Sequence, residues 1–256
     1  MFMIGSLLFH GFIIVSALTA GMIALVLDRV APARLLPFGQ AWAKLALFAL
    51  RGFCGISVRI EGLEHLPQGA VILAAQHQSA FDTLIWFTRL NAPAYVMKQE
   101  LRRMPIIGRL LVPAGQIAID RTGGAAALRD LIEQCRAAAA AGRQIIIFPE
   151  GTRVAPGQRV ALQPGIVAIA RATGLKVIPV ATDSGRYWAR DAIRKRPGTI
   201  RIKLFPALPQ GLDRAAMIAA LEVAFYERGV VDNHGDNRAT SLSREINTPS
   251  QPTDRK

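Results

Sequence analysis

The chain has 256 residues, which is enough for one domain with a full hydrophobic core. Hydrophobic residues make up 51% of it, and 31 basic against 18 acidic residues give a net charge of +13. Such a charge attracts polyanions, but no helix-turn-helix, zinc-finger or aromatic-basic RNA signature is present, which argues against a nucleic-acid binder. The two cysteines, Cys54 and Cys135, are far apart and fit neither a metal site nor a disulfide framework, in agreement with a reducing compartment.

The N-terminus is predicted to be a membrane helix. No Asp, Glu, Lys or Arg occurs before Asp28, and residues 4–27 are apolar or weakly polar. About 20 apolar residues cross a bilayer core, so this run is long enough. A signal peptide is the first alternative, but no basic residue precedes the run and its apolar part is too long. A buried helix of a soluble protein is the second alternative.

The residues that follow this helix predict its orientation. Basic side chains occur only after the apolar run, so the positive-inside rule places the rest of the chain on the cytoplasmic side of the inner membrane. A second apolar segment, residues 35–58, carries Lys44 and Arg51 and is expected to be an interfacial or partly buried helix. If it spanned the membrane instead, the main domain would face the other side. The excess of basic residues predicts binding to an anionic membrane surface.

Short apolar runs then alternate with helical stretches, which predicts an α/β domain with a mixed central sheet flanked by helices. We expect strands at residues 58–60, 70–76, 94–97, 116–119, 144–148, 177–181 and 200–205. Helices are expected at residues 81–90, 124–141, 164–173 and 214–227. The predicted organisation is a membrane-anchoring segment (residues 1–57), an α/β domain (residues 58–231) and a disordered polar tail (residues 232–256).

The first candidate site lies at the end of the strand predicted at residues 70–76. His77 follows this strand directly, and Asp82 comes five positions later. A carboxylate can hold a nearby imidazole in one tautomer and let it act as a base. A surface histidine beside an unrelated aspartate is the alternative interpretation of these two residues alone.

The second candidate site follows the strand predicted at residues 144–148. Gly151 permits close backbone approach, Thr152 can donate from its hydroxyl, and Arg153 offers a planar fork that matches a phosphate. Glu150 could orient Arg153 or accept a hydrogen bond from a substrate hydroxyl. Because ligands gather beyond the carboxyl ends of strands in open α/β sheets, we expect a phosphate site here. A turn with a solvated arginine is the alternative.

Several other kinds of site are absent from the sequence. No Gly-Lys-Ser/Thr ending or dinucleotide fingerprint is present, and Ser79 lacks the flanking glycines of a nucleophile elbow. No His/Cys cluster has the spacing of metal ligands. We therefore expect no metal, no cofactor and no serine nucleophile.

Four blocks, in the right order and spacing, resemble those of the glycerolipid acyltransferases. Residues 77–82 resemble their H-x4-D box, and residues 148–153 resemble their F-P-E-G-T-R box. Residues 98–108 resemble the K-x-E-L-x3-P-x2-G segment, with its I-D-R ending at residues 119–121, and residues 177–180 resemble the apolar-proline block. The resemblance covers residues 63–212 and is similar to the 1-acyl-glycerol-3-phosphate acyltransferases. One departure is Gln76, where the family often has Asn, and this leaves the acceptor open.

The resemblance implies a reaction of phospholipid biosynthesis. A fatty acyl group would move from acyl-CoA or acyl carrier protein to the sn-2 hydroxyl of lysophosphatidic acid, giving phosphatidic acid. His77 would take the proton of the attacking hydroxyl, and Asp82 would fix its tautomer. Alternatives are another lysolipid acceptor, such as lyso-ornithine lipid, and a non-catalytic membrane protein that binds anionic lipid.

The resemblance also implies a binding site for the acceptor. Arg153, with Gly151 and Thr152, would hold the phosphate, and Glu150 would share in binding the acceptor. Two further cations of the resembling blocks, Lys98 and Arg121, are candidates for contact with the phosphate or the acyl carrier.

Overall fold

The protein is described by a computed structural model that covers residues 2–230, so the tail predicted at residues 232–256 lies outside the described residues. A seven-stranded sheet forms the centre, with strand order β1-β7-β6-β2-β5-β3-β4. The strands β6 and β7 are antiparallel and all other neighbours are parallel, so the sheet is mixed, as predicted. The strands are β1 (Ile56–Glu61), β2 (Val71–Ala75), β3 (Pro93–Lys98), β4 (Ile117–Ile119), β5 (Gln144–Ile147), β6 (Val177–Thr182) and β7 (Gly198–Leu204).

Strand β2 lies in the middle of the sheet, between β5 and β6, and is buried on both faces. Its side chains alternate: Ile72 and Ala74 join the core on one face, and Val71, Leu73 and Ala75 join the core on the other. A parallel strand that is covered on both faces reads as a continuous apolar run, which is the pattern of residues 71–75. This burial fixes the position of the residues that follow the strand.

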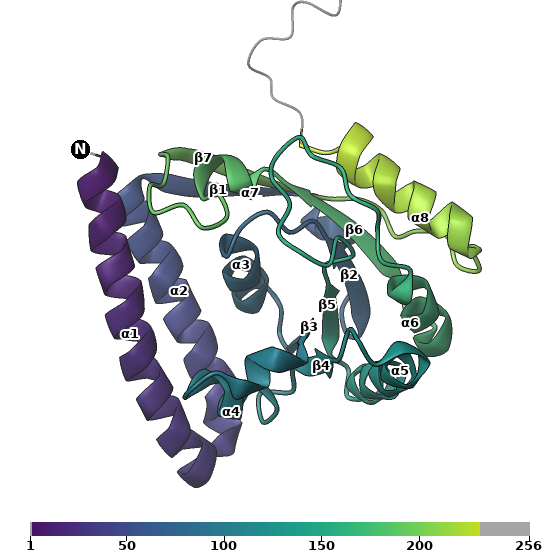
Figure 1. Cartoon of the computed structure of the whole chain (residues 1–256), viewed down its shortest axis with the longest axis horizontal. Coiled ribbons are helices and arrows are strands. Elements are labelled where there is room, and N and C mark those ends of the chain that lie inside the picture. Colours follow the sequence, from purple (N-terminus) through teal and green to yellow (C-terminus); the bar gives the residue numbers. More distant parts are fainter. Residues whose placement is uncertain (1, 231–256) are drawn as a thin grey trace, which may run out of the picture.

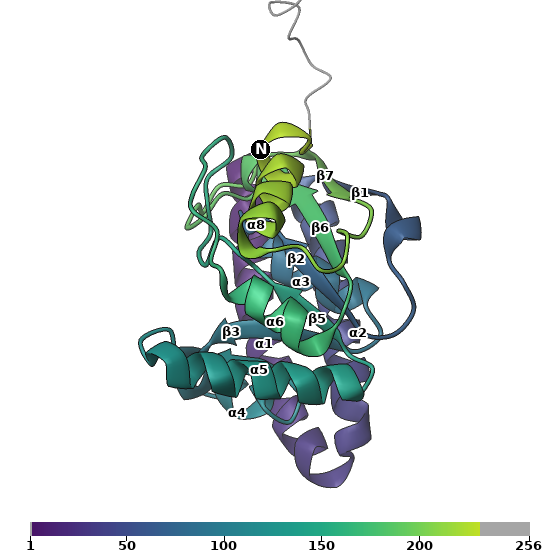
Figure 2. The ribbon, with the colours of Figure 1, turned by 90° about the vertical axis from the view of Figure 1, so that its right-hand side faces the viewer.

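Helices cover the two faces (Figures 1 and 2). On one face lie α5 (Gly124–Ala140), α6 (Gly165–Thr173) and α8 (Arg214–Glu222), which continues as a π-helical turn (Val223–Glu227). On the other lies α3 (Phe81–Arg89). The strands and helices predicted for residues 58–227 are thus confirmed, while two short helices, α4 (Ile107–Leu111) and α7 (Ser184–Tyr187), and three short 3-10 turns were not predicted.

The N-terminal segment forms a helical hairpin beside α3 (Figure 1). Helix α1 (Phe2–Val30) is long and apolar enough to cross a membrane, and only a small share of it is buried inside the protein. Helix α2 (Leu35–Cys54) ends where Gly55 takes a left-handed conformation (φ 65°). The strand β1 begins at Ile56, so the last residues of the predicted anchoring segment, and Val58 of the predicted second helix, belong to the sheet instead.

The hairpin presents a row of exposed apolar side chains. On α1 these recur at helical spacing, and α2 adds to them, as in Ile4, Leu7, Leu8, Ile14, Val15, Leu18, Met22, Ile23, Val26, Leu45, Phe48 and Phe53. Exposed apolar patches of this extent mark membrane or protein contacts.

A buried lysine joins the hairpin to the catalytic domain. Lys195, on the segment between α7 and β7, is 1% exposed, and its ammonium Nζ lies 2.9 Å from His10 Nε2 of α1. The backbone N–H of Lys195 donates to Ser6 Oγ (2.9 Å), and its ammonium lies over the ring of Trp188. Burial lowers the pKa of Lys195. His10 Nδ1 lies 2.8 Å from the Ser6 carbonyl oxygen, so it donates there and leaves Nε2 to accept from the lysine.

Candidate active site

His77 and Asp82 form a pair at the carboxyl end of β2. His77 follows β2, Asp82 lies in the first turn of α3, and His77 Nδ1 is 3.3 Å from Asp82 Oδ2. The same carboxylate oxygen accepts the backbone N–H groups of Gln78 and Ser79, each at 2.8 Å. The carboxylate is therefore fixed, and Nδ1–H of His77 donates to it, which leaves Nε2 free to accept a proton.

The His77 imidazole is also held by an aromatic ring that packs against its face. The ring of His77 stacks on Phe148, with ring centroids 4.1 Å apart and an interplanar angle of 18°. Phe148 follows β5, the neighbour of β2 in the sheet, so the stack joins the two motif segments. Ser79 is fully buried, and its hydroxyl accepts the N–H of Phe81 at 3.2 Å. Ser79 thus forms a local turn just before α3.

Gln76, the departure from the family's usual Asn, has a structural contact. Its Oε1 accepts the backbone N–H of Thr182 at 3.1 Å, so it joins the end of β2 to the end of β6. Two residues later, Gln78 makes a similar contact with α7, where its Oε1 accepts the N–H of Gly185 at 3.1 Å. Gln76 and Gln78 line the same polar cavity as Glu150, separate from the cavity that His77 lines.

Glu150 lies against the backbone of His77. Its Oε2 accepts the His77 N–H at 2.7 Å, and its Oε1 accepts the hydroxyl of Tyr226 at 3.1 Å. The carboxyl is 4% exposed, and burial, only partly offset by these two hydrogen bonds, raises its pKa to about 7. It faces a polar cavity of about 220 Å³ that Arg153 does not line. Of the two roles considered for Glu150, orienting Arg153 is not found, because its partners are His77 and Tyr226. Its part in acceptor binding stays a prediction.

The other predicted binding residues gather around one cavity with His77. Gly151, Thr152 and Arg153 come from the loop after β5, Arg121 from the turn after β4, and Lys98 from the end of β3. The Arg121 guanidinium donates to the Gly151 carbonyl oxygen. Gly151 has φ 69°, a left-handed conformation that favours glycine and turns this carbonyl toward Arg121.

Two residues beside this cluster were not predicted from the sequence. Arg190 lines the cavity, and its Nη1 donates to Thr152 Oγ1 at 3.3 Å. Asp191 Oδ1 lies 3.5 Å from Arg153 Nη2. Both belong to the segment between α7 and β7, outside every motif, and only their charge could have drawn attention to them.

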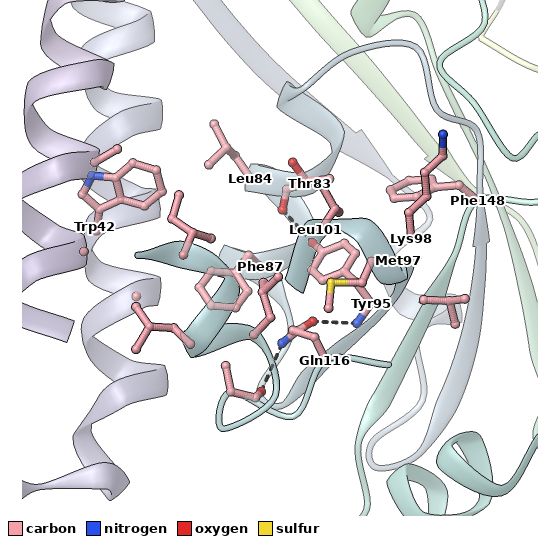
Figure 3. A pocket seen from close by; sticks show the side chains of 18 of the residues that line it. Trp42, Thr83, Leu84, Phe87, Tyr95, Met97, Lys98, Leu101, Gln116 and Phe148 are labelled. Carbon is pink, nitrogen blue, oxygen red and sulfur yellow. Dashed lines mark hydrogen bonds between the residues drawn. The ribbon is translucent and has the colours of Figure 1, made fainter. Parts of the chain in front are cut away.

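The cavity has a volume of about 620 Å³ and is mostly apolar (Figure 3). Trp42 of α2 lies toward one side of it and Phe148 and Lys98 toward the other, with Phe87 and Leu101 between them. The hairpin contributes small and apolar residues to the wall, among them Ala17, Ala20, Gly21, Ala24, Leu35 and Gly39. One chamber thus joins a base, a cluster of cations and an apolar space, which suits an amphiphile with an anionic headgroup. Among the described residues, no group of His, Cys, Asp or Glu could hold a metal ion.

Comparison with known proteins agrees with this geometry. Residues 57–183 match the Acyltransferase family. The chain is 32% identical over 207 residues to a 1-acyl-sn-glycerol-3-phosphate acyltransferase of Pseudomonas aeruginosa, and the match covers 80% of each chain. The chain belongs to this acyltransferase family. It is accordingly an O-acyltransferase of lipid biosynthesis.

Two further relatives of the acyltransferase bear on its fold and its acceptor. It is 28% identical over 210 residues to a lyso-ornithine lipid O-acyltransferase of Pseudomonas aeruginosa, covering 74% of this chain and 79% of the relative. The crystal structure of a 1-acyl-sn-glycerophosphate (LPA) acyltransferase from Thermotoga maritima superposes with a TM-score of 0.70 at 22% identity. That match covers 96% of this chain and 97% of the other, so the fold is shared over nearly the whole length.

Proposed function

We propose that this acyltransferase transfers a fatty acyl group from an acyl thioester to the sn-2 hydroxyl of 1-acyl-glycerol-3-phosphate, giving phosphatidic acid. The observation that carries the proposal is the shared cavity. His77, oriented by Asp82, lines one chamber with a cluster of cations that includes Arg153 and Arg121, and most of the remaining wall is apolar.

In the proposed reaction His77 acts as a general base. The acceptor hydroxyl oxygen attacks the thioester carbonyl carbon while Nε2 of His77 takes its proton. The tetrahedral intermediate then expels the thiolate, which takes the proton back from the imidazolium. General-base help of this kind contributes about 10²–10⁴-fold to the rate. The nucleophile belongs to the substrate, so no acyl-enzyme forms.

The cations place the acceptor. Arg153 presents a planar fork to the phosphate, and Arg121 and Lys98 add positive charge in the same cavity. Holding the phosphate there keeps the glycerol hydroxyl beside His77, and such positioning lowers the barrier by several kcal/mol (about 7–11 at most). The apolar part of the cavity offers room for an acyl chain. The acyl donor is acyl-CoA or acyl carrier protein, and both present the acyl chain as a thioester.

The apolar face of the hairpin supports a site at the membrane. We infer that this face contacts lipid, because its leucine, isoleucine, methionine and phenylalanine side chains have no cover in the protein. The substrate and the product are lipids, and withdrawing an acyl chain into water costs about 0.8 kcal/mol per CH₂. Lysine and arginine occur only from Arg29, in the last turn of α1, onward, which supports a catalytic domain on the cytoplasmic side of the inner membrane.

The test is release of free thiol from acyl-CoA by the purified protein in detergent, across a panel of lysolipids. We expect release with lysophosphatidic acid, loss of activity in His77→Ala, and a raised acceptor KM in Arg153→Ala. Full activity of His77→Ala would show that the proposed base is wrong. Release with lyso-ornithine lipid alone would replace the proposed acceptor by the one named for the second relative.

A further inference from the structure

The segment between α7 and β7, residues 188–197, runs beside the loop that carries Arg153. Arg190 Nη1 lies 3.3 Å from Thr152 Oγ1 and 3.5 Å from the Arg153 carbonyl oxygen. These hydrogen bonds are long, so they hold the guanidinium loosely. Arg190 also lines the cavity that contains His77, although it lies far from every motif in the sequence.

The next residue, Asp191, lies between two guanidinium groups. Its Oδ2 is 3.2 Å from Arg190 Nε, and its Oδ1 is 3.5 Å from Arg153 Nη2. Two oxygens of a phosphate could bridge the same pair of arginines in the same way. The Asp191 side chain is 72% exposed, and exposed ion pairs are weak, so a dianionic phosphate can displace it at little cost.

The charges around the cavity favour an anionic headgroup without a cationic part. Among the described residues, the lining contains four permanently basic side chains, from Lys98, Arg121, Arg153 and Arg190, and no carboxylate. A phosphate gains from all four. The headgroup of a lyso-ornithine lipid is zwitterionic: these cations attract its carboxylate but repel its ammonium group, so its net attraction is smaller than that of a phosphate.

We propose that Arg190 is a further acceptor-binding residue that selects a phosphate headgroup. When no acceptor is bound, the Asp191 carboxylate takes the place of the phosphate between Arg190 and Arg153. The inference rests on the proposed function, since it names a residue for the acceptor of that same reaction. In the bound state, the guanidinium groups of Arg190 and Arg153 contact the phosphate from opposite sides. On binding, the Arg190 side chain moves from Asp191 to the phosphate.

The experiment measures kcat and KM for lysophosphatidic acid and for lyso-ornithine lipid with purified, detergent-solubilised protein and acyl-CoA as the donor. The variants are Arg190→Gln, Arg190→Lys, Asp191→Asn and a matched control, Arg194→Gln. Arg194 is exposed on the same segment and does not line the cavity, so its substitution removes the same charge away from the site. Thermal unfolding of each variant reports whether it is folded.

We expect Arg190→Gln to lower kcat/KM for lysophosphatidic acid by about 10- to 100-fold, the size of a lost charge-assisted hydrogen bond. The loss should appear in the acceptor KM, and the ratio of phosphate to ornithine acceptor use should fall with it. Arg190→Lys keeps the charge without the fork and should lie between the wild type and Arg190→Gln. Asp191→Asn should bind the acceptor as well as the wild type or more tightly, and Arg194→Gln should match the wild type.

A wild-type acceptor KM in folded Arg190→Gln overturns the inference. So does a change confined to the KM of acyl-CoA, which would assign Arg190 to the donor, or an equal loss in Asp191→Asn, which would make the pair structural. If the wild type consumes lysophosphatidic acid while Arg190→Gln is unchanged, this inference alone fails. If the wild type uses only lyso-ornithine lipid, the proposed function fails together with it.

Discussion

Replacing Glu150 by glutamine separates two roles that its position allows. Glutamine has nearly the same shape, so its Oε1 can accept the His77 N–H that Glu150 accepts at 2.7 Å. Its amide can donate to the Tyr226 hydroxyl, which now donates to Glu150 at 3.1 Å and can reverse its role. Glu150→Gln therefore imitates the protonated acid and preserves both contacts.

The raised pKa of Glu150 sets the size of the effect on stability. Its pKa is about 7 in the folded protein against the usual 4.5, a difference worth about 3 kcal/mol. The folded protein binds this proton more tightly than the unfolded chain does. The free energy of unfolding of the wild type therefore falls as the pH rises from 4.5 to about 7, and stays lower above that. The Glu150→Gln variant lacks this loss.

The assay is thermal unfolding of both proteins in the same detergent between pH 5 and pH 8. About 2.5 kcal/mol of the wild type's stability is lost between pH 5 and pH 8. Relative to the wild type, Glu150→Gln should therefore gain roughly 5–10 °C in Tm over this interval, since 1 kcal/mol corresponds to about 2–4 °C in a protein of this size. Glu133→Gln, at an exposed glutamate of α5, is the control and should show no such trend. A difference in Tm that stays constant with pH would refute the argument, because the Glu150 carboxyl would then be as well solvated in the folded protein as in the unfolded chain.

The activity of the same variant tests the role that the family resemblance implies. If Glu150 acts by holding the His77 backbone, Glu150→Gln should keep kcat/KM for the acceptor within about tenfold of the wild type, because that hydrogen bond is preserved. A large rise in acceptor KM in a variant that is at least as stable as the wild type would instead assign the negative charge of Glu150 to acceptor binding.

Three other predictions follow from the site and the hairpin. His77→Ala should lower kcat by about 10²–10⁴-fold in the thiol-release assay while liposome binding is unchanged; equal loss of both would indicate misfolding. Trp42→Ala should enlarge the apolar end of the cavity and shift the donor preference toward longer acyl chains, as measured by competition between acyl-CoA species. An unchanged preference would show that the acyl chain binds elsewhere. Leu18→Asp with Met22→Asp, both on the exposed face of α1, should weaken liposome flotation, since a charge at the centre of a membrane helix costs about 2.5–3.5 kcal/mol, whereas full binding would show that this face avoids lipid.

Much of the fold could be predicted because the hydrophobic pattern of this chain is strong. The strand at residues 71–75 is apolar throughout because both faces of the sheet are covered, and helix α5 is rich in alanine. Helices α4 and α7 were missed because segments of five and four residues are too short to show a helical period. The end of the second apolar segment was placed too late, because Ile56 and Val58 are apolar in a strand as they would be in a helix.

The site could be predicted in part. His77 and Arg153 meet because β2 and β5 are parallel neighbours, whose carboxyl ends lie at the same edge of the sheet. The direction in which each side chain points could not be predicted from the order of the strands. Glu150 turns away from Arg153 because its partners are the His77 backbone and Tyr226, a residue of the C-terminal helix that only tertiary packing brings near. Arg190 joins the cavity by the same kind of packing, and no motif marks it.

The burial of Lys195 bears on how this enzyme can be handled. A form of the protein without α1 would leave the Lys195 ammonium without His10 and would open one wall of the substrate cavity. The ammonium would become exposed and keep the Ala192 and Ile193 carbonyl oxygens, but Trp188 would lose its packing against Phe9 of α1. Exposing such apolar contacts to water destabilises the fold. Helix α1 is thus a structural part of the catalytic domain, and it cannot be removed without disturbing that domain. A water-soluble form would have to keep the hairpin whole and exchange only its outward apolar side chains for polar ones.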